Sequence, residues 1–407
     1  MINPIILEKF YFTRLYSLDL IRVSSFHNSS IFAGSENGYY ALLTPLTLFA
    51  WSVLGIQLIY LVMLLFAFSR KRIAGNDITP PVSVIICAHD EEKNLRELIP
   101  LLLQQDYSHF EVIIVEDRCN DGTYDFLLEA TQLDKRLKMV RVRHLPEHVS
   151  GKKYALTLGI KAAAYEWVLF TDADCRPNSN QWIRSMASHF NESAQIVLGY
   201  SPYTKSPGYL NSFIRFESLL TGIQFIGWAL LGRPYMGVGR NLAYRKALFF
   251  ENKGFNNLLR ITGGDDDLFV NKHATTKNTA VSIGAALIMP STPKKTWKEF
   301  FYQKLRHLSV GKYYNLNDRI LLGLFSSTWI MTWFYVVPLM CIGIDNFLWA
   351  GILLREIALL CLVHRASRTL GDAFETWKTP FLDFNYAIYY LGTGLAALLS
   401  KRVRWKI

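Results

Sequence analysis

Cysteine is scarce in this sequence and shows no paired pattern. The 407 residues include five cysteines, an odd number, and no two of them form a Cys-x-x-Cys pair. Paired or clustered cysteines mark disulfide-rich secreted domains and zinc sites. The sequence therefore predicts neither a disulfide framework nor structural zinc, and it favours a reducing compartment for the polar part of the chain.

Two other patterns are missing. Residues 1–41 lack the charged, apolar and small-residue order of a cleavable signal, and we assign them no role. Although the formal net charge is +11, the sequence has no dense Lys/Arg array with interleaved aromatic residues, so nucleic acid is not expected as a partner. A basic balance is also typical of proteins that meet anionic lipid or an anionic substrate.

The sequence does contain long apolar runs, and hydrophobic residues make up 51% of the chain. Residues 42–69 form one run that is long enough to cross ~30 Å of hydrocarbon. The basic Arg70-Lys71-Arg72 follows at once, which predicts a cytoplasmic end here and an outside N-terminus. A buried core helix is the alternative, and the length and the basic edge argue against it. Residues 315–363 predict a transmembrane hairpin, with runs at about 320–344 and 347–363.

The last segment, 364–407, is predicted to hold a cytoplasmic loop, a short apolar membrane segment over 385–399 and a basic tail. If 385–399 crossed the membrane, Lys401 to Lys406 would lie outside, against the charge rule. We therefore expect a re-entrant or interfacial segment there. Together the runs predict a multi-pass protein of the cell (inner) membrane, with the polar residues 80–314 in the cytoplasm.

Strand-like and helical stretches alternate within that polar region. The strand-like runs are Val82 to Cys87, Val112 to Val115, Met139 to Val142, and a run from Trp167 that ends at Asp174. Such alternation predicts the α/β class, with a parallel doubly wound sheet. Ligands of these sheets bind outside the carboxyl ends of the strands.

Acidic residues follow three of the strands. Asp90 and Glu91 follow the first, where Asp90 is expected to cap the next helix, and Asp117 ends the second. Asp172 and Asp174 are spaced i, i+2, so in an extended chain they present oxygen to one point. Hard oxygen ligands suit Mg²⁺ or Mn²⁺, with a substrate phosphate completing the shell. The alternative is an Asx turn after a strand.

Lys152 begins the helix before that strand and is a candidate phosphate partner at the same edge. A second acidic cluster, Asp265-Asp266-Asp267, follows two glycines that permit an unusual backbone path. Adjacent acids on a helix start point about 100° apart, so the three cannot all face one substrate. Asp265 is best placed to do so and Asp266 is the second choice, while Asp267 is expected to cap or face solvent. Alternatively, all three simply favour the helix dipole.

Two helical stretches complete the polar region. Residues 209–232 predict an interfacial helix, with a helix packed in the soluble core as the alternative. Gln303, Arg306 and His307 lie at i, i+3 and i+4 and share one face of an amphipathic helix. A solvated basic face near anionic lipid is the alternative for them.

From Val82 to His307 the order of motifs resembles glycosyltransferase family 2, with its GT-A fold. The matching pieces are Val82 to Ile86 with Glu91-Glu92, Val115-Glu116-Asp117, Gly151-Lys152, Asp172-Ala173-Asp174, the cluster at Asp265, and Gln303-x-x-Arg306-His307. The family pattern has Trp at the last of these positions.

The resemblance implies an inverting transfer from a nucleotide-diphosphate sugar to a lipid-linked or glycan acceptor, on Mg²⁺ or Mn²⁺, beside membrane lipid. It implies Asp265 or Asp266 as the general base, Asp174 and Asp172 as metal ligands, and His307 as an acceptor contact. The implied donor-binding residues are Ala88, Glu91, Asp117, Lys152, Asp172, Gln303 and Arg306.

Chemistry supports the same reading of the acidic positions. A diphosphate leaving group needs its charge neutralised, and the acceptor hydroxyl needs a base. A processive polysaccharide synthase is one alternative, but the expected spans are few for a translocation pore. A catalytically silent membrane scaffold with a nucleotide-binding fold is the other, and the intact acidic positions argue against it.

Overall fold

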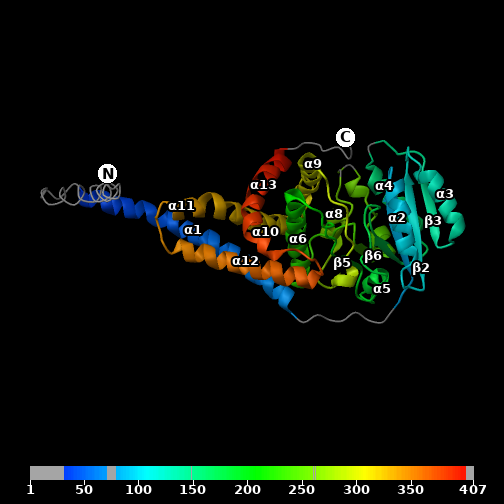
Figure 1. Ribbon diagram of the computed structural model, residues 1–407, viewed down its shortest axis with the longest axis horizontal. Helices are drawn as coiled ribbons and strands as arrows, with labels where there is room; N and C mark the ends of the chain where they lie inside the picture. Colours follow the sequence, from blue (N-terminus) through cyan, green and yellow to red (C-terminus); the bar gives the residue numbers. More distant parts are fainter. Residues whose placement is uncertain (1–31, 71–78, 148, 260, 262, 400–407) are drawn as a thin grey trace, which may run out of the picture.

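A computed structural model describes residues 32–70, 79–147, 149–259, 261 and 263–399. The molecule is elongated, with a bundle of helices at one end and a sheet covered by helices at the other (Figure 1). Two predictions concern residues outside the described ranges: most of the basic edge after the first apolar run, and the tail from Lys401 to Lys406.

The sheet has seven strands within the described residues, in the order β3-β2-β1-β4-β6-β5-β7. Their bounds are β1 Val82–Ala88, β2 Phe110–Asp117, β3 Leu137–Val142, β4 Trp167–Phe170, β5 Ile196–Gly199, β6 Leu242–Arg245 and β7 Thr279–Ser282. The α/β class and the four strands expected from the sequence are confirmed. The fourth, however, ends at Phe170, so Asp172 and Asp174 lie in the turn beyond it.

The sheet is mixed rather than wholly parallel, which corrects the sequence prediction. Strands β1 to β4 pair in parallel, whereas β6 pairs antiparallel with both β4 and β5. The register places Phe170, the last residue of β4, opposite Leu242, the first residue of β6. The segment that enters β6 therefore meets the segment that leaves β4 at the same edge.

Alternate strand residues point to the two faces of the sheet, and each face has its own apolar core. Ile85, Ile113 and Phe170 belong to one core, and Val84, Ile114 and Leu169 to the other. The helices of the sheet domain are α2 Glu92–Leu103, α3 Thr123–Leu133, α4 Gly151–Ala162, α5 Trp182–Ala187, α6 Tyr209–Leu230, α7 Lys246–Glu251, α8 Asp267–His273 and α9 Trp297–Leu308. Helices α4 and α6 cover the first face, and α2, α3 and α5 cover the second, so the sheet is doubly wound as expected.

The prediction that Asp90 caps α2 is wrong. The N-cap is Glu91, and Asp90 has a left-handed backbone with φ 57°. In that conformation its Oδ1 atom accepts a hydrogen bond from the backbone of Asn120 at 2.7 Å. Asp90 therefore ties the β1 loop to the β2 loop.

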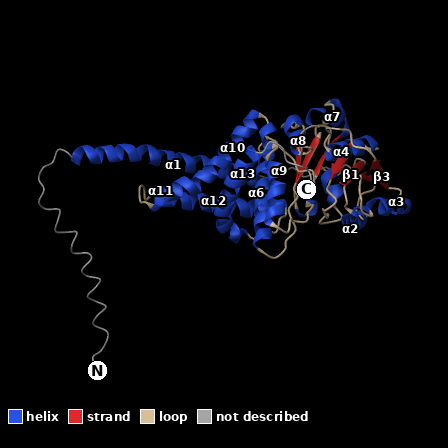
Figure 2. Ribbon diagram, turned by 90° about the horizontal axis from the view of Figure 1, so that it is seen from above, coloured by secondary structure: helices blue, strands red, loops and turns tan. Residues whose placement is uncertain are grey.

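Helix α6 joins the two ends of the molecule. Most of its residues are buried, and it packs against α1, Phe32–Ser69, and α12, Leu348–Leu370, on one side and the sheet on the other. Figure 2 shows it between the helix bundle and the strands. One continuous apolar core includes Leu64 of α1, Phe216 of α6 and Phe170 of β4. Helix α6 therefore lies in the core, which was the alternative, and not at an interface.

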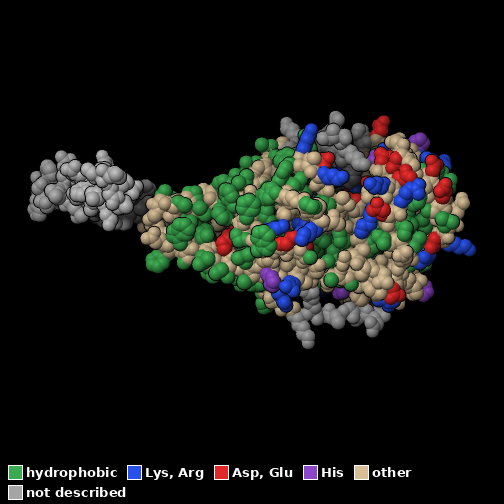
Figure 3. All heavy atoms as spheres, viewed as in Figure 1, with side chains coloured by type: hydrophobic (Ala, Val, Ile, Leu, Met, Phe, Trp, Pro, Cys, Tyr) green, Lys and Arg blue, Asp and Glu red, His purple; other side chains and the backbone are tan. Residues whose placement is uncertain are grey.

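The bundle also contains α10 Leu316–Met331, a π-helical turn at Thr332–Val336, α11 Val337–Cys341 and α13 Thr379–Leu399. Among the described residues, two segments are long and apolar enough to cross a membrane by length and composition, Thr44–Ser69 and Leu316–Cys341. Figure 3 shows hydrophobic side chains over this end of the molecule and charged ones over the sheet domain. Helix α12 is not one of these two segments. It carries Arg355, which is fully buried and paired with Asp383 of α13.

Candidate active site

A pocket lies at the carboxyl edge of β4, where α4, α6, α8 and α9 converge. Its acidic and basic lining comes from six separate segments of the chain. These residues are Lys152, Asp172, Asp174, Glu217, Arg240, Asp265, Asp266, Asp267, Lys304, Arg306 and His307. Gln303 lines it as well, so the fold brings eight of the eleven predicted site residues into one pocket.

Lys152 connects the two acidic clusters that the sequence analysis singled out. Its Nζ atom lies 3.1 Å from Asp172 and 3.4 Å from Asp265. Burial alone would lower the pKa of Lys152, but the carboxylates of Asp172, Asp265 and Asp266 raise it well above its ordinary value. Lys152 therefore stays charged and holds the turn after β4 against the start of α8.

The neighbouring Lys153 has a different task. Its side chain is fully buried, and its ammonium donates hydrogen bonds to the carbonyls of Leu258, Ile261 and Gly263. Both Gly263 and Gly264 have left-handed backbones, with φ 81° and 78°. Lys153 thus fixes the strained turn from which the second acidic cluster projects.

The two carboxylates after β4 differ in their electrostatic surroundings. Burial would raise the pKa of Asp172, but Lys152, followed by Arg240 and Arg306, lowers it below the ordinary value. Burial and then the charge of Asp172 raise the pKa of Asp174. Within the described residues no basic side chain lies at ion-pair distance from Asp174. A cation bound between these two oxygen donors would relieve the repulsion, so the residues fit a divalent metal ion.

The three adjacent acids occupy three different positions. Asp266 is the N-cap of α8, where its side chain accepts hydrogen bonds from the backbone of Asp267 at 2.8 Å and of Gly239 at 2.7 Å. Asp267 is buried, and its side chain accepts hydrogen bonds from the backbone of Leu268 at 2.7 Å and from the Tyr314 hydroxyl at 3.0 Å. The expectation that it faces solvent is therefore wrong, and the N-cap position itself belongs to Asp266. Asp265, before the helix, is the one that contacts Lys152.

Helix α9 carries Gln303, Arg306 and His307 on the pocket side. Its register is set at its start, where Thr296 accepts a hydrogen bond from the backbone of Glu299 and Glu299 accepts one from the backbone of Lys295. A threonine whose side chain accepts a first-turn amide is a favoured N-cap. The expected shared face is therefore confirmed as part of the pocket wall.

Three predicted donor-binding residues lie outside the pocket lining. Ala88 ends β1 and is fully buried, and Glu91 accepts a hydrogen bond from Asn94 at 2.7 Å. Asp117 ends β2, 2.8 Å from the Arg118 guanidinium. These residues follow strands β1 and β2, beside β4 in the sheet, so they continue the carboxyl edge on which the pocket lies.

Several pocket residues were missed by the sequence analysis. Arg240 lies in the segment that enters β6, and the buried pair Glu217 and Lys304 joins α6 to α9. Tyr200 lines the pocket and donates a hydrogen bond to Asp372 at 2.7 Å, in the loop after α12. The Gly-Val-Gly-Arg-Asn sequence before a short strand was the available signal for Arg240. The other three have no local sequence signal, because only packing brings them to the pocket.

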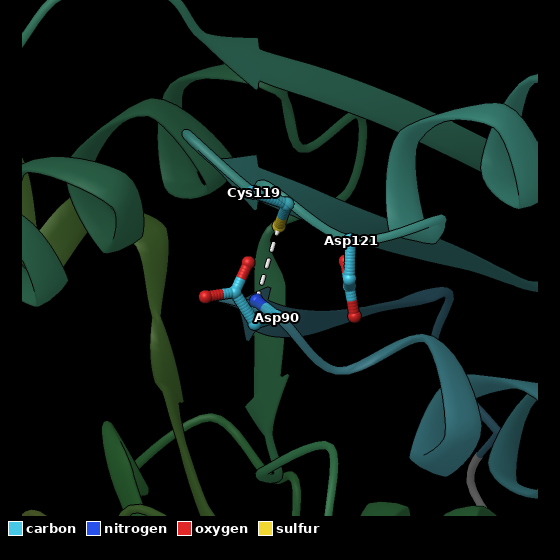
Figure 4. Close-up of side chains that lie close together, drawn as sticks. All are labelled: Asp90, Cys119 and Asp121. Carbon is cyan, nitrogen blue, oxygen red and sulfur yellow. Dashed lines mark hydrogen bonds between the residues drawn. The ribbon is translucent and has the colours of Figure 1, made fainter.

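Another group of possible metal ligands lies outside the pocket lining. Asp90, Cys119 and Asp121 lie close together on the loops after β1 and β2 (Figure 4). Backbone amides already occupy their acceptors: Asp90 accepts from Asn120, Asp121 accepts from Thr123 and Glu92, and the Cys119 sulfur accepts from Asp90. Burial raises the pKa of Cys119 to about 11, which disfavours the thiolate that a metal would need. This group serves to hold the two loops together.

Comparisons with known proteins agree with this architecture. Residues 83–249 match the family described as Glycosyl transferase family 2. A structure of the mannosyltransferase PcManGT from Pyrobaculum calidifontis, in complex with GDP-Man and Mn²⁺, covers 89% of this chain and 99% of its own. Its TM-score is 0.58 at 17% identity, which shows that the two chains share a fold.

Sequence relatives cover a smaller part of the chain. An uncharacterized glycosyltransferase of Haemophilus influenzae is 26% identical over 148 residues, which are 36% of this chain and 42% of that protein. The UDP-Glc:alpha-D-GlcNAc-diphosphoundecaprenol beta-1,3-glucosyltransferase WfaP of Escherichia coli is 24% identical over 145 residues, which are 35% of this chain and 50% of that protein. The chain thus spans about half the length of the curated relatives it matches.

The two acidic groups predict different responses to mutation. Asp174→Asn removes one of the two carboxylates predicted to bind the metal and should abolish Mn²⁺ binding, measured by calorimetry or by the paramagnetic resonance of free Mn²⁺. The matched control is Asp121→Asn, in the group of Figure 4, and it should leave Mn²⁺ affinity unchanged. Loss of binding in the control with retention in Asp174→Asn would move the metal site to the loops after β1 and β2.

Proposed function

Residues 83–249 belong to glycosyl transferase family 2, and from this premise we propose that the chain is an inverting glycosyltransferase. It moves a sugar from a nucleotide-diphosphate sugar to a lipid-linked or membrane-proximal glycan acceptor. One observation carries the proposal: a single pocket joins two acidic clusters, the ammonium of Lys152 that bridges them, and Arg306 from α9. These are the groups that departure of a diphosphate and activation of a hydroxyl require.

Donor binding is assigned to the carboxyl edge of the sheet. The nucleoside part lies over the ends of β1 and β2, at Ala88, Glu91 and Asp117, and the diphosphate reaches the pocket beside Asp172. Asp174 and Asp172 would hold Mg²⁺ or Mn²⁺ there. When bound, that ion neutralises charge on the leaving diphosphate. Lys152, Gln303 and Arg306 bind and orient the same group from the walls of the pocket.

Asp265 is proposed as the general base. Its side chain is largely buried in the pocket wall, where one carboxylate oxygen lies 3.4 Å from the Lys152 ammonium. Asp266 is the second candidate, but both of its oxygens already accept backbone hydrogen bonds. A base must reach the proton that it removes, so the acid with fewer fixed partners is favoured.

The acceptor is assigned to the far side of the pocket. Besides its titratable groups, the pocket is lined by apolar side chains, among them Phe225 of α6, Met236 and Val310. Because α6 also packs against the helix bundle, this wall leads from the acidic groups toward the apolar end of the molecule. A headgroup carried on a lipid suits such a wall. A processive polysaccharide synthase stays the alternative within this class, and the product length distinguishes the two.

The function is tested by a donor screen on the full chain in detergent. UDP- and GDP-sugars are each incubated with Mn²⁺ or Mg²⁺, with and without membrane lipid extract, and release of nucleoside diphosphate is read. We expect release with at least one donor and stimulation by lipid extract. Binding of nucleotide without any turnover would favour the catalytically silent scaffold.

We propose that the protein lies in the cell (inner) membrane, with the sheet domain in the cytoplasm. Thr44–Ser69 and Leu316–Cys341 have the required length and composition, and the first is followed by a basic edge. A cysteine introduced at Asp125 in the exposed part of α3 should react with an impermeant reagent only after the cells are opened. Reaction in intact cells would reverse this orientation.

Asp265→Asn should keep donor binding and melting temperature but lower kcat by roughly 10²–10⁴-fold, because it removes the base. Asp266→Ala should lower the free energy of unfolding by about 0.5–2 kcal/mol, because it removes the cap of α8. Turnover and thermal melting are measured for both variants and for Asp266→Asn. Normal turnover in Asp265→Asn together with loss of turnover in Asp266→Asn would assign the general base to Asp266.

His307→Ala should raise the KM for the acceptor more than the KM for the donor. The residue is exposed on the pocket side of α9, next to Arg306 and near the apolar wall. Initial rates are measured with each substrate varied in turn. An unchanged acceptor KM would return His307 to an ordinary position on the helix surface.

A further inference from the structure

Arg240 reaches the pocket because one strand of the sheet is reversed. β6 is antiparallel to β4, and Leu242 pairs with Phe170 at their shared edge. Arg240 precedes Leu242 by two residues, and Asp172 follows Phe170 by two residues. The pairing therefore brings Arg240 to the edge from which the predicted metal ligands project, and both residues line the same pocket.

The backbone on either side of Arg240 is held in place. On one side, the Gly239 amide donates a hydrogen bond to Asp266 at 2.7 Å. On the other, the fully buried Asn241 side chain donates to the carbonyls of Tyr200 and Leu287 and accepts from the indole of Trp182. Because both neighbours are fixed, the chain presents the Arg240 side chain to the pocket before any ligand arrives.

Only some of the hydrogen-bond donors of the Arg240 guanidinium have partners. It lies over the Tyr203 ring, 4.5 Å from the ring centre, and its Nη2 atom donates to the Ser201 carbonyl at 3.3 Å. Its Nη1 atom is buried, and within the described residues it has no hydrogen-bond partner. No carboxylate of those residues lies within ion-pair distance of Arg240. A buried donor without a partner is costly, and at charged groups the cost is greater.

We propose that Arg240 binds phosphoryl oxygens of the donor diphosphate, an inference that rests on the proposed function. Its position beside Asp172 and Asp174 is where a metal-bound diphosphate would lie, and a guanidinium fork matches the spacing of phosphoryl oxygens. Stacking on Tyr203 fixes the plane of the fork while leaving Nη1 for the ligand. Arg240, from the segment before β6, and Arg306, from α9, then contact the diphosphate from two walls of the pocket.

A purely structural role makes a different prediction. If Arg240 served only to neutralise Asp172 and Asp174, its removal would leave those carboxylates more available to a cation. Arg240→Gln would then bind Mn²⁺ more tightly and would bind nucleotide at least as well as the native protein. If Arg240 binds the diphosphate, the loss falls on ligands with two phosphates and not on the metal alone.

The experiment measures calorimetric affinities of the full chain in detergent for UDP, GDP, UMP and GMP, each with Mn²⁺, and for Mn²⁺ alone. For the nucleoside diphosphate that binds the native protein, Arg240→Gln should lose affinity by about tenfold to a hundredfold. The matching monophosphate should lose about threefold or less, since it lacks the second phosphoryl group. Arg240→Lys keeps a charge beside Tyr203 without the planar fork, so it should retain the fold and recover part of the affinity.

Arg233→Gln is the matched control, because Arg233 pairs with Asp318 and does not line the pocket. It should bind all four nucleotides as the native protein does. Equal loss for diphosphate and monophosphate, or unchanged diphosphate affinity in Arg240→Gln, would overturn the inference. If the native protein bound no nucleotide with Mn²⁺, the proposed function itself would fail, and that result is distinct from a failure confined to Arg240.

Discussion

The contact of the Lys152 ammonium with both acidic turns is the interaction on which this site depends. Asp172 and Asp174 follow β4, Asp265 precedes α8, and without a cation between them these carboxylates would repel one another across a buried space. Lys152 comes from the first turn of α4, whose position is fixed by packing on β1 and β2. The framework of the sheet thus sets the distance between the two acidic turns, and one side chain holds it.

The neighbouring Lys153 shows that the side of α4 from which a lysine projects decides which groups it contacts. Lys153 points away from the pocket and secures the backbone before the second cluster, while Lys152 faces the carboxylates. Adjacent residues on a helix point about 100° apart, so the two lysines cannot exchange roles. One short helix start therefore both positions the acidic turn and partly neutralises it.

The helix bundle and the sheet domain form one packed body. A single apolar core runs from α1 through α6 to the strands, and buried Arg215 of α6 is paired with Asp372 and Glu375 in the loop after α12. Tyr200 lines the pocket and bonds to the same Asp372. A change in the packing of the bundle that moves Asp372 would therefore shift Tyr200 in the wall of the pocket. These contacts link the apolar end of the molecule to the site of the proposed chemistry.

The sequence by itself determined the elements and their polar ends. The apolar runs predicted four strands, the acids after them marked the carboxyl edge, and the spacing of Gln303, Arg306 and His307 predicted a shared helix face. These are local properties, set by periodicity and by the residues that end an element. Only the tertiary structure decided that β6 runs antiparallel, that α6 lies in a shared core, that Asp266 rather than Asp267 caps α8, and that Arg240 joins the pocket. Each of those depends on which distant segments pack together, as when the Gly239 amide donates to Asp266. The Gly-Val-Gly-Arg-Asn sequence indicates a turn at Arg240, but only packing places that turn at the pocket.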